Sequence, residues 1–203
     1  MGANDSLVAQ KYYKKATQYY RENFLDSSVF YYRKAQVHYG NVGDLTNKNR
    51  CYIDISYNYI LKGDYGNAEK ILSDGLNQCI EELGSNNAQT ASIYGTLGIL
   101  YNKKGDYYES IAYFKKSLEI KKSVYGEEHI STAQSYNNLA ITYWNIKDVN
   151  QSLGYHQKAL EIKKKFWIQI MLVWQFPIIT WVIFIITIKN TKRQRNSIKN
   201  HLK

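Results

Sequence analysis

The chain has 203 residues, enough for one ordinary domain with a sizeable core, and its single Pro and 20 Tyr favour long helices with aromatic packing. The net charge of +10 is uneven, because residues 1–165 hold 21 of the 27 Lys and Arg and all 17 Asp and Glu, whereas residues 166–203 hold six basic groups and no acid. No nucleic-acid-binding motif accompanies these charges, so a nucleic-acid partner is not expected.

The first ten residues contain no basic stretch followed by an apolar run, which argues against a secretory signal and favours a cytoplasmic location. From residue 5 the chain then carries four copies of one helical pattern, over about 5–40, 47–82, 88–123 and 130–165. The last two copies align without a gap at an offset of 42 residues. Apolar positions recur at helical spacing within each copy, so we expect each copy to form two helices with one buried face each.

Small residues occupy the positions where the two helices of each copy would touch. In the first helix they are Ala16, Ser56, Gly98 and Ala140, and in the second Ser28, Ala68, Ser110 and Ser152. A bulky core position follows at Tyr32, Leu72, Phe114 and His156. Gly63 and Gly105 predict a left-handed turn between the helices, followed by Asp64 and Asp106 as helix caps. Lys147 replaces this glycine in the fourth copy, whose turn is therefore expected to be looser.

This pattern resembles the tetratricopeptide repeat, and its 42-residue period with the connector sequence YGEEH is similar to that of kinesin light chains. The resemblance covers residues 5–165. It implies an all-α fold, a right-handed α-solenoid of helix-turn-helix hairpins with a concave groove lined by the first helix of each hairpin. It also implies a protein-protein interaction scaffold or adaptor, with a protein or peptide as its partner.

The family pattern predicts which side chains face the groove. The residues predicted to bind a peptide are Tyr20, Tyr57, Ile99, Asn102, Asn137, Ile141 and Trp144. The same pattern predicts that Ile60 also faces the groove. The Lys and Asn pair that clamps a terminal carboxylate in chaperone-binding relatives is absent from the corresponding positions, so we expect apolar pockets and amide groups that hold an extended peptide. The alternative is that Tyr57, Ile99 and Ile141 pack between neighbouring first helices.

Side chains able to support catalysis or hold a metal occur singly. Cys51 and Cys79 have no CxxC spacing and no neighbouring His cluster, so we interpret them as reduced packing residues. The four histidines lack a partnered nucleophile or carboxylate, and no glycine-rich phosphate loop occurs. We therefore expect no catalytic or metal-binding residue, no cofactor, no small-molecule substrate and no enzymatic activity.

The composition changes abruptly after Lys165. Residues 166–188 carry no charge and are long enough to span a bilayer, and residues 189–203 form a basic tail. At face value this is a hydrophobic C-terminal helix and an apparent transmembrane segment. The alternative function is accordingly a single-pass, tail-anchored membrane receptor with the repeats in the cytoplasm.

A second interpretation, which we favour, is that residues 166–203 are a fifth repeat read one base out of frame. Each new codon is the last base of one residue's codon followed by the first two bases of the next. Four results are then forced by the genetic code: Leu from Phe166–Trp167, Asp from Trp167–Ile168, Ala from Trp174–Gln175 and Gly from Trp181–Val182. The degenerate positions allow the string V-L-D-T-N-H-A-S-V-A-I-S-Y-N-N-L-G-N-I-Y, which aligns with residues 124–143 at the same offset of 42.

Overall fold

The computed structural model describes residues 2–170, with side chains from residue 5, and every element in that range is a helix. The helices are α1 (Gly2–Arg21), α2 (Leu25–Asn41), α3 (Leu45–Leu61), α4 (Tyr65–Leu83), α5 (Ala88–Lys104), α6 (Tyr107–Tyr125) and α7 (Ile130–Asn145). A further helix begins at residue 149 and continues to residue 170. The predicted all-α pattern of paired helices is therefore present over this part of the chain.

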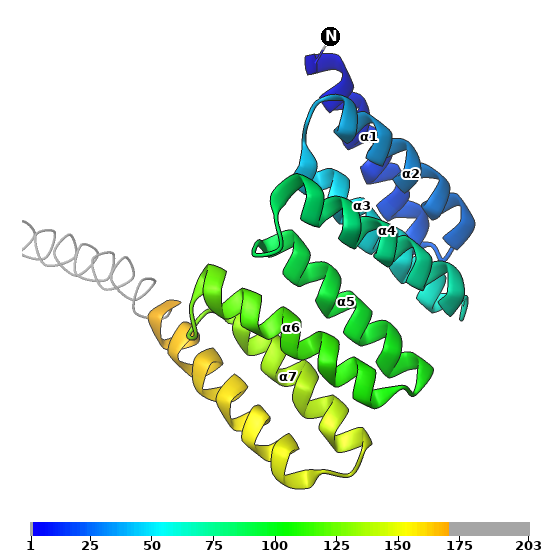
Figure 1. Ribbon diagram of the computed structural model, residues 1–203. Helices are drawn as coiled ribbons and strands as arrows, with labels where there is room; N and C mark the ends of the chain where they lie inside the picture. Colours follow the sequence, from blue (N-terminus) through cyan, green and yellow to red (C-terminus); the bar gives the residue numbers. More distant parts are fainter. Residues whose placement is uncertain (1, 171–203) are drawn as a thin grey trace, which may run out of the picture. The chain divides into compact units, whose positions relative to one another are not determined.

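Residues 1–160 form one compact unit in which each helix from α1 to α7 packs on the next, as Figure 1 shows. In addition, α3 packs directly on α5, so the first helices of successive hairpins are neighbours. Residues from Glu161 onward belong to a second unit. The apparent transmembrane segment 166–188 lies outside the described residues from 171 on, as does the whole basic tail 189–203. Among residues 2–170, no helix combines the length and the apolar character needed to cross a membrane.

The predicted small residues lie where the paired helices touch. Ala16, Ser56 and Ala140 are fully buried, and a Cβ added to Gly98 would lie 2.6 Å from the Phe114 ring. The side chains predicted to follow them in the core are also buried in the first three hairpins. In the fourth hairpin this prediction is wrong, because His156 is exposed.

Two helical glycines provide a matched pair of substitutions. We expect Gly98→Ala to lower the free energy of unfolding by about 1–3 kcal/mol, because the new methyl group would overlap the buried ring of Phe114. Gly154→Ala should instead raise this free energy by up to about 1 kcal/mol, since nothing lies within 4 Å of the new Cβ and alanine is the better helix former. Urea unfolding of both variants followed by circular dichroism measures the two changes. Equal effects would contradict the close helix contact at Gly98.

The turns inside the hairpins have the predicted left-handed residue. Gly63 and Gly105 have φ values of 73° and 88°, and Lys147 adopts the same conformation with φ of 65°. The turn of the fourth hairpin also keeps its backbone hydrogen bond, from the N–H of Asp148 to the carbonyl of Tyr143 at 2.9 Å. Thus the fourth turn retains the geometry of the others but holds a lysine in a conformation that favours glycine.

Of the two predicted aspartate caps, one is present. The Asp64 side chain accepts a hydrogen bond from the backbone N–H of Asn67, as expected of an N-cap residue. Asp106 occupies the N-cap position of α6 without making such a bond, and its carboxylate lies 3.5 Å from the Nζ atom of Lys104. The prediction that Asp106 caps α6 with its side chain is therefore wrong.

Replacement of Lys147 by glycine should stabilise the fold. We expect Lys147→Gly to raise the free energy of unfolding by about 1 kcal/mol, because glycine adopts positive φ without steric cost. The control is Lys103→Gly in the last turn of α5, which should lower the same quantity by a similar amount because it places glycine in a helix. Thermal unfolding of both variants tests the pair, and a destabilised Lys147→Gly variant would contradict the strained turn.

Candidate functional site

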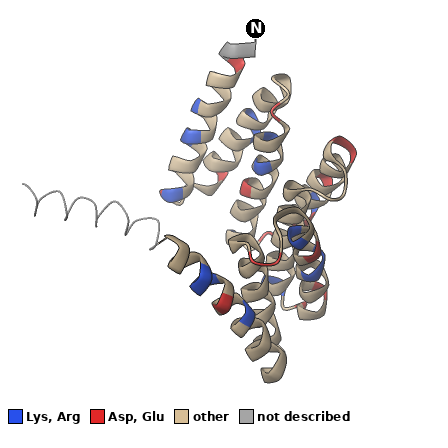
Figure 2. Ribbon diagram, turned by 90° about the vertical axis from the view of Figure 1, so that its left-hand side faces the viewer, with Lys and Arg blue, Asp and Glu red and all other residues tan. Residues whose placement is uncertain are grey.

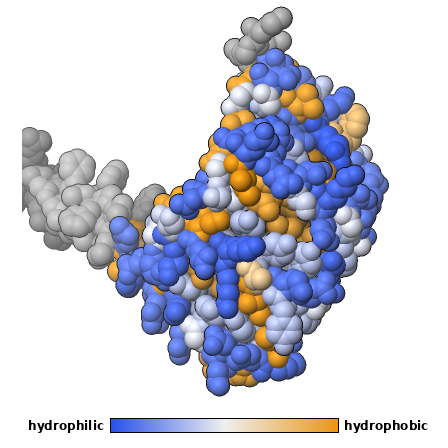
Figure 3. Space-filling model, viewed as in Figure 1, coloured by the Kyte–Doolittle hydropathy of each residue, from blue (hydrophilic) through white to orange (hydrophobic). Residues whose placement is uncertain are grey.

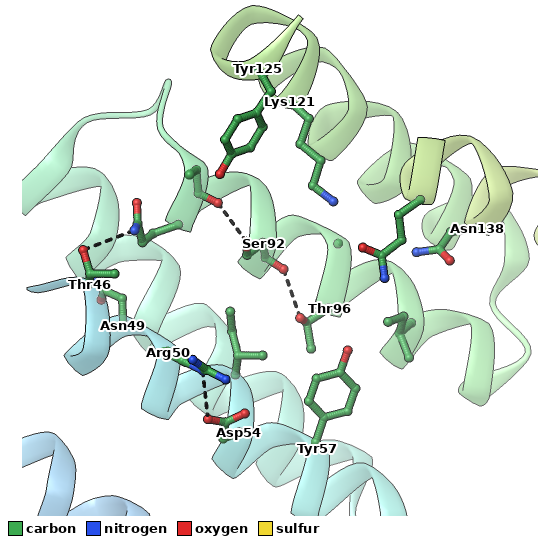
Figure 4. A pocket seen from close by; sticks show the side chains of 16 residues that line it. Thr46, Asn49, Arg50, Asp54, Tyr57, Ser92, Thr96, Lys121, Tyr125 and Asn138 are labelled. Atoms are coloured by element: carbon green, nitrogen blue, oxygen red, sulfur yellow. Dashed lines mark hydrogen bonds and ion pairs between the residues drawn. The ribbon is translucent and has the colours of Figure 1, made fainter. Parts of the chain in front are cut away.

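A groove on the face formed by α3, α5, α6 and α7 encloses a cavity of about 380 Å³, which we call the main cavity (Figure 4). Side chains at equivalent positions of three hairpins line it, each 42 residues from the next. They are Arg50, Ser92 and Gln134 in one row and Asp54, Thr96 and Asn138 in the row one helical turn further. Because these residues are i and i+4 on their helices, each helix contributes one polar stripe. The repeat itself therefore builds the groove.

Lys121, on the second helix of its hairpin, brings a positive charge into this groove. Its side chain reaches into the cavity from α6, while Tyr57 projects into it from α3 (Figure 4). The Nζ atom donates a hydrogen bond to Oγ of Ser135 at 3.1 Å, and no carboxylate in the described part of the chain forms an ion pair with it. Burial lowers the pKa of Lys121. An anionic group in the cavity would restore the lost solvation of this ammonium.

The acid of the groove, by contrast, already has partners. The hydroxyl of Tyr13 donates to Oδ2 of Asp54 at 2.5 Å, and Nε of Arg50 lies 3.8 Å from the same oxygen. Burial is the largest influence on Asp54 and raises its pKa, against the opposite effects of Tyr13 and Arg50. Asp54 is thus held by α1 and by its own helix. The groove presents one partnered acid and one ammonium without a carboxylate.

Two smaller cavities adjoin the predicted residues. One of about 130 Å³ is lined by Ile99, Asn102 and Ile141, together with Asn138 and Thr142. There the Asn102 amide donates to Oγ1 of Thr142 at 2.9 Å, and its carbonyl accepts from the Asn145 amide at 3.3 Å. These bonds join α5 to α7, so Asn102 contributes to packing between first helices as well as to the cavity wall.

The other small cavity, of about 110 Å³, is lined by Tyr20, Tyr32, Asp54 and Tyr57. Burial raises the pKa of Tyr32 to about 12, so its hydroxyl stays protonated at neutral pH. This hydroxyl lies 3.1 Å from Oγ1 of Thr17. The cavity therefore offers mainly aromatic surface and hydroxyl groups around one carboxylate.

Five of the seven predicted binding residues line these cavities. Tyr57 lines the main cavity and, with Tyr20, the 110 Å³ cavity. Ile99 lines the main cavity and, with Asn102 and Ile141, the 130 Å³ cavity. The other two, Asn137 and Trp144, line none of the three. Ile60 is only 7% exposed and packs in the core with Leu72, so its predicted groove position is wrong.

The polar residues of the groove were missed by the sequence analysis for two reasons. Arg50, Asp54, Gln134 and Asn138 lie on a neighbouring stripe, in which Asp54 and Asn138 come three residues before the predicted Tyr57 and Ile141. The 42-residue offset contains the signal that links them to Ser92 and Thr96. Lys121 comes from a second helix, and no sequence pattern points it into the groove. Figure 3 shows one face of the molecule, where apolar side chains lie among hydrophilic ones.

Comparison with known proteins supports the helical repeat. Residues 89–165 match the family model described as the tetratricopeptide repeat. No curated protein matches the chain. Among solved structures, BtubC (BKLC) from P. vanneervenii is 19% identical, with a TM-score of 0.67 over 80% of this chain and 65% of that protein.

Two further solved structures share the fold. The Rap conjugation gene regulator of the plasmid pLS20, solved in complex with the Phr* peptide, is 18% identical with a TM-score of 0.68 over 79% of this chain and 43% of that protein. A putative kinesin light chain from Podosopora anserina with nearly identical TPR-like repeats is 14% identical, with a TM-score of 0.59 over 78% of this chain and 76% of that protein. The chain thus spans less than two thirds of BtubC and of the Rap regulator.

Proposed function

Because the chain is a tetratricopeptide repeat protein, we propose that it is a protein-interaction scaffold whose groove binds an extended peptide carrying a carboxylate. The observation that carries this proposal is Lys121, a half-buried lysine in the main cavity with no carboxylate partner among the described residues. A peptide carboxylate would form a charge-assisted hydrogen bond there. Tyr57, Ile53 and Ile99 offer apolar surface beside it.

The remaining wall suits the backbone of an extended peptide. Gln134 and Asn138 carry both donors and acceptors, as peptide recognition requires. The Rap regulator, a structural relative, was solved with a bound peptide, which supports the same use of a similar fold. Lys and Arg are interspersed with Asp and Glu along the helices in Figure 2, and we assign the proposed acid selectivity to Lys121.

An array of short random-sequence peptides tests this function with the full chain. We expect the chain to select peptides with at least one Asp or Glu beside apolar residues, and we expect Lys121→Met to weaken their binding about tenfold or more, as for a hydrogen bond to a charged group. Lys115→Met, on the exposed side of the same helix, is the matched control and should leave binding unchanged. Absence of any sequence-selective binding would contradict the scaffold function. Selection without acidic preference would contradict only the role of Lys121.

The second candidate function, a tail-anchored membrane receptor, rests on residues 166–188 of the sequence. Alkaline extraction of membranes that contain the full chain distinguishes it from an unanchored scaffold. Retention of the chain in the membrane fraction would support the receptor, and its release into the supernatant would exclude it.

A further inference from the structure

The fourth hairpin has an apolar stripe exposed on its second helix. Val149, Leu153, His156 and Leu160, which we call the open face, follow one another at spacings of four, three and four residues and so share one side of the helix. Leu153 is 56% exposed and Leu160 is 51% exposed. Large apolar side chains aligned in this way are typical of a surface that another element covers.

The same positions are covered one repeat earlier. Ile111, Phe114 and Leu118 lie 42 residues before Leu153, His156 and Leu160, and they are only 8%, 3% and 8% exposed. Their helix, α6, packs on α5 within its own hairpin and on α7 of the next hairpin. The difference in exposure therefore marks the position at which a fifth hairpin would place its first helix.

The end of the second helix of the fourth hairpin also differs from the ends of α4 and α6. The helices α4 and α6 end at Gly84 and Gly126, whose φ values are 83° and 89°. The residue 42 positions after Gly126 is Ile168, and here the helix continues to residue 170. A β-branched residue strongly disfavours positive φ, so the displayed sequence cannot readily make the turn that leads into a further hairpin.

We propose that the open face is the docking surface for the first helix of a fifth tetratricopeptide hairpin, whose sequence is encoded one base out of register after the Lys165 codon. The Ala and the Gly that the second frame dictates fall 42 residues after Ala133 and Ala140, both of which are fully buried in α7. The second frame also permits Tyr and Leu 42 residues after Tyr136 and Leu139, which are 3% and 0% exposed.

The helix encoded in this way has the apolar pattern of α7, the helix that covers the equivalent face of α6. Its connector departs from the two before it, because the second frame dictates Asp where Gly84 and Gly126 stand in the earlier connectors. The small residue in the middle of the helix, however, is preserved as the forced Gly. The proposed occupant is therefore an amphipathic hairpin of this repeat family.

The nucleotide sequence provides the first test. Several independent reads of the genome and of the transcript across codons 160–170 should contain one nucleotide more than the displayed frame. An intact displayed frame in every read would overturn the proposal that this gene encodes the fifth hairpin.

The second test examines docking directly with two full-length proteins, the displayed chain and one in which a single inserted nucleotide in codon 165 restores the repeat. We expect Leu153→Ala to lower the melting temperature of the restored protein by about 5 °C, because it removes a newly buried side chain, and to change the displayed chain by less than about 1 °C. Tyr108→Ala is the control in both proteins, since Tyr108 is 76% exposed on α6. Equal shifts in the two proteins would overturn the proposal. So would a dimer of the displayed chain that sedimentation shows to dissociate on Leu153→Ala, because a second copy would then cover the open face.

Discussion

Replacement of Leu72 by alanine is expected to lower the free energy of unfolding by about 3 kcal/mol, the largest stability change proposed for a single side chain of this protein. Leu72 is fully buried on α4 and belongs to a cluster that includes Ile60 of α3 and Leu97 of α5. Its removal leaves a cavity between two hairpins as well as within one. Because a repeat protein is stabilised by contacts between neighbouring repeats, the loss weakens the coupling between the second and third hairpins.

Urea unfolding of the Leu72→Ala variant measures this change. The control is Leu61→Ala at the end of α3, where the side chain is 58% exposed, and it should alter the free energy by less than about 0.5 kcal/mol. The midpoint is expected to fall for Leu72→Ala with little change in the slope of the transition. If the two leucine variants were equally stable, the interface between these hairpins would not be the core that we describe.

Binding of an acidic peptide should weaken as the pH rises. Burial lowers the pKa of Lys121 below its ordinary value of 10.5 in the free protein, whereas a bound carboxylate would raise it. The affinity is therefore highest below the pKa of the free protein and falls as the pH passes through that value towards the pKa of the complex. Full deprotonation of Lys121 should cost about tenfold or more in the dissociation constant.

The measurement is a titration of one selected acidic peptide between about pH 7 and about pH 11, a range that covers the ordinary lysine pKa. Lys121→Met should bind weakly with little dependence on pH, and Lys115→Met should follow the wild-type curve. A wild-type affinity that stays constant over this range would show that the ammonium of Lys121 does not hold the peptide carboxylate.

The helices and their contacts were accessible from the sequence because the repeat imposes them four times. The small residues Ala16, Ser56, Gly98 and Ala140 all allow the two helices of a hairpin to touch. The positive φ of Gly63 and Gly105 follows from their place after a helix. Lys147 shows why the fourth turn was harder to predict. A lysine is not expected at positive φ. Its backbone nevertheless follows the other turns, because the same backbone hydrogen bond closes the turn.

The groove was less predictable than the fold. The stripe that includes Asp54, Thr96 and Asn138 lies three residues before the predicted Tyr57, Ile99 and Ile141 on the same helices, and such a shift leaves the helical periodicity unchanged. The burial of Ile60 depends on packing against Leu72 of another helix. Lys121 reaches the groove from a second helix, and its direction follows from the angle between helices, which a sequence pattern does not contain.

The open face has a consequence for the order in which the hairpins unfold. In a linear stack each inner hairpin is stabilised from two sides, whereas the fourth has a neighbour on one side only within the described residues and also holds Lys147 in a strained turn. Fraying should therefore begin at the fourth hairpin and progress towards the first, with Gln134 and Asn138 among the earliest groove residues to lose their positions. A ligand that contacts α3, α5 and α7 would stabilise the folded fourth hairpin, so that peptide binding and the folding of this hairpin become thermodynamically linked.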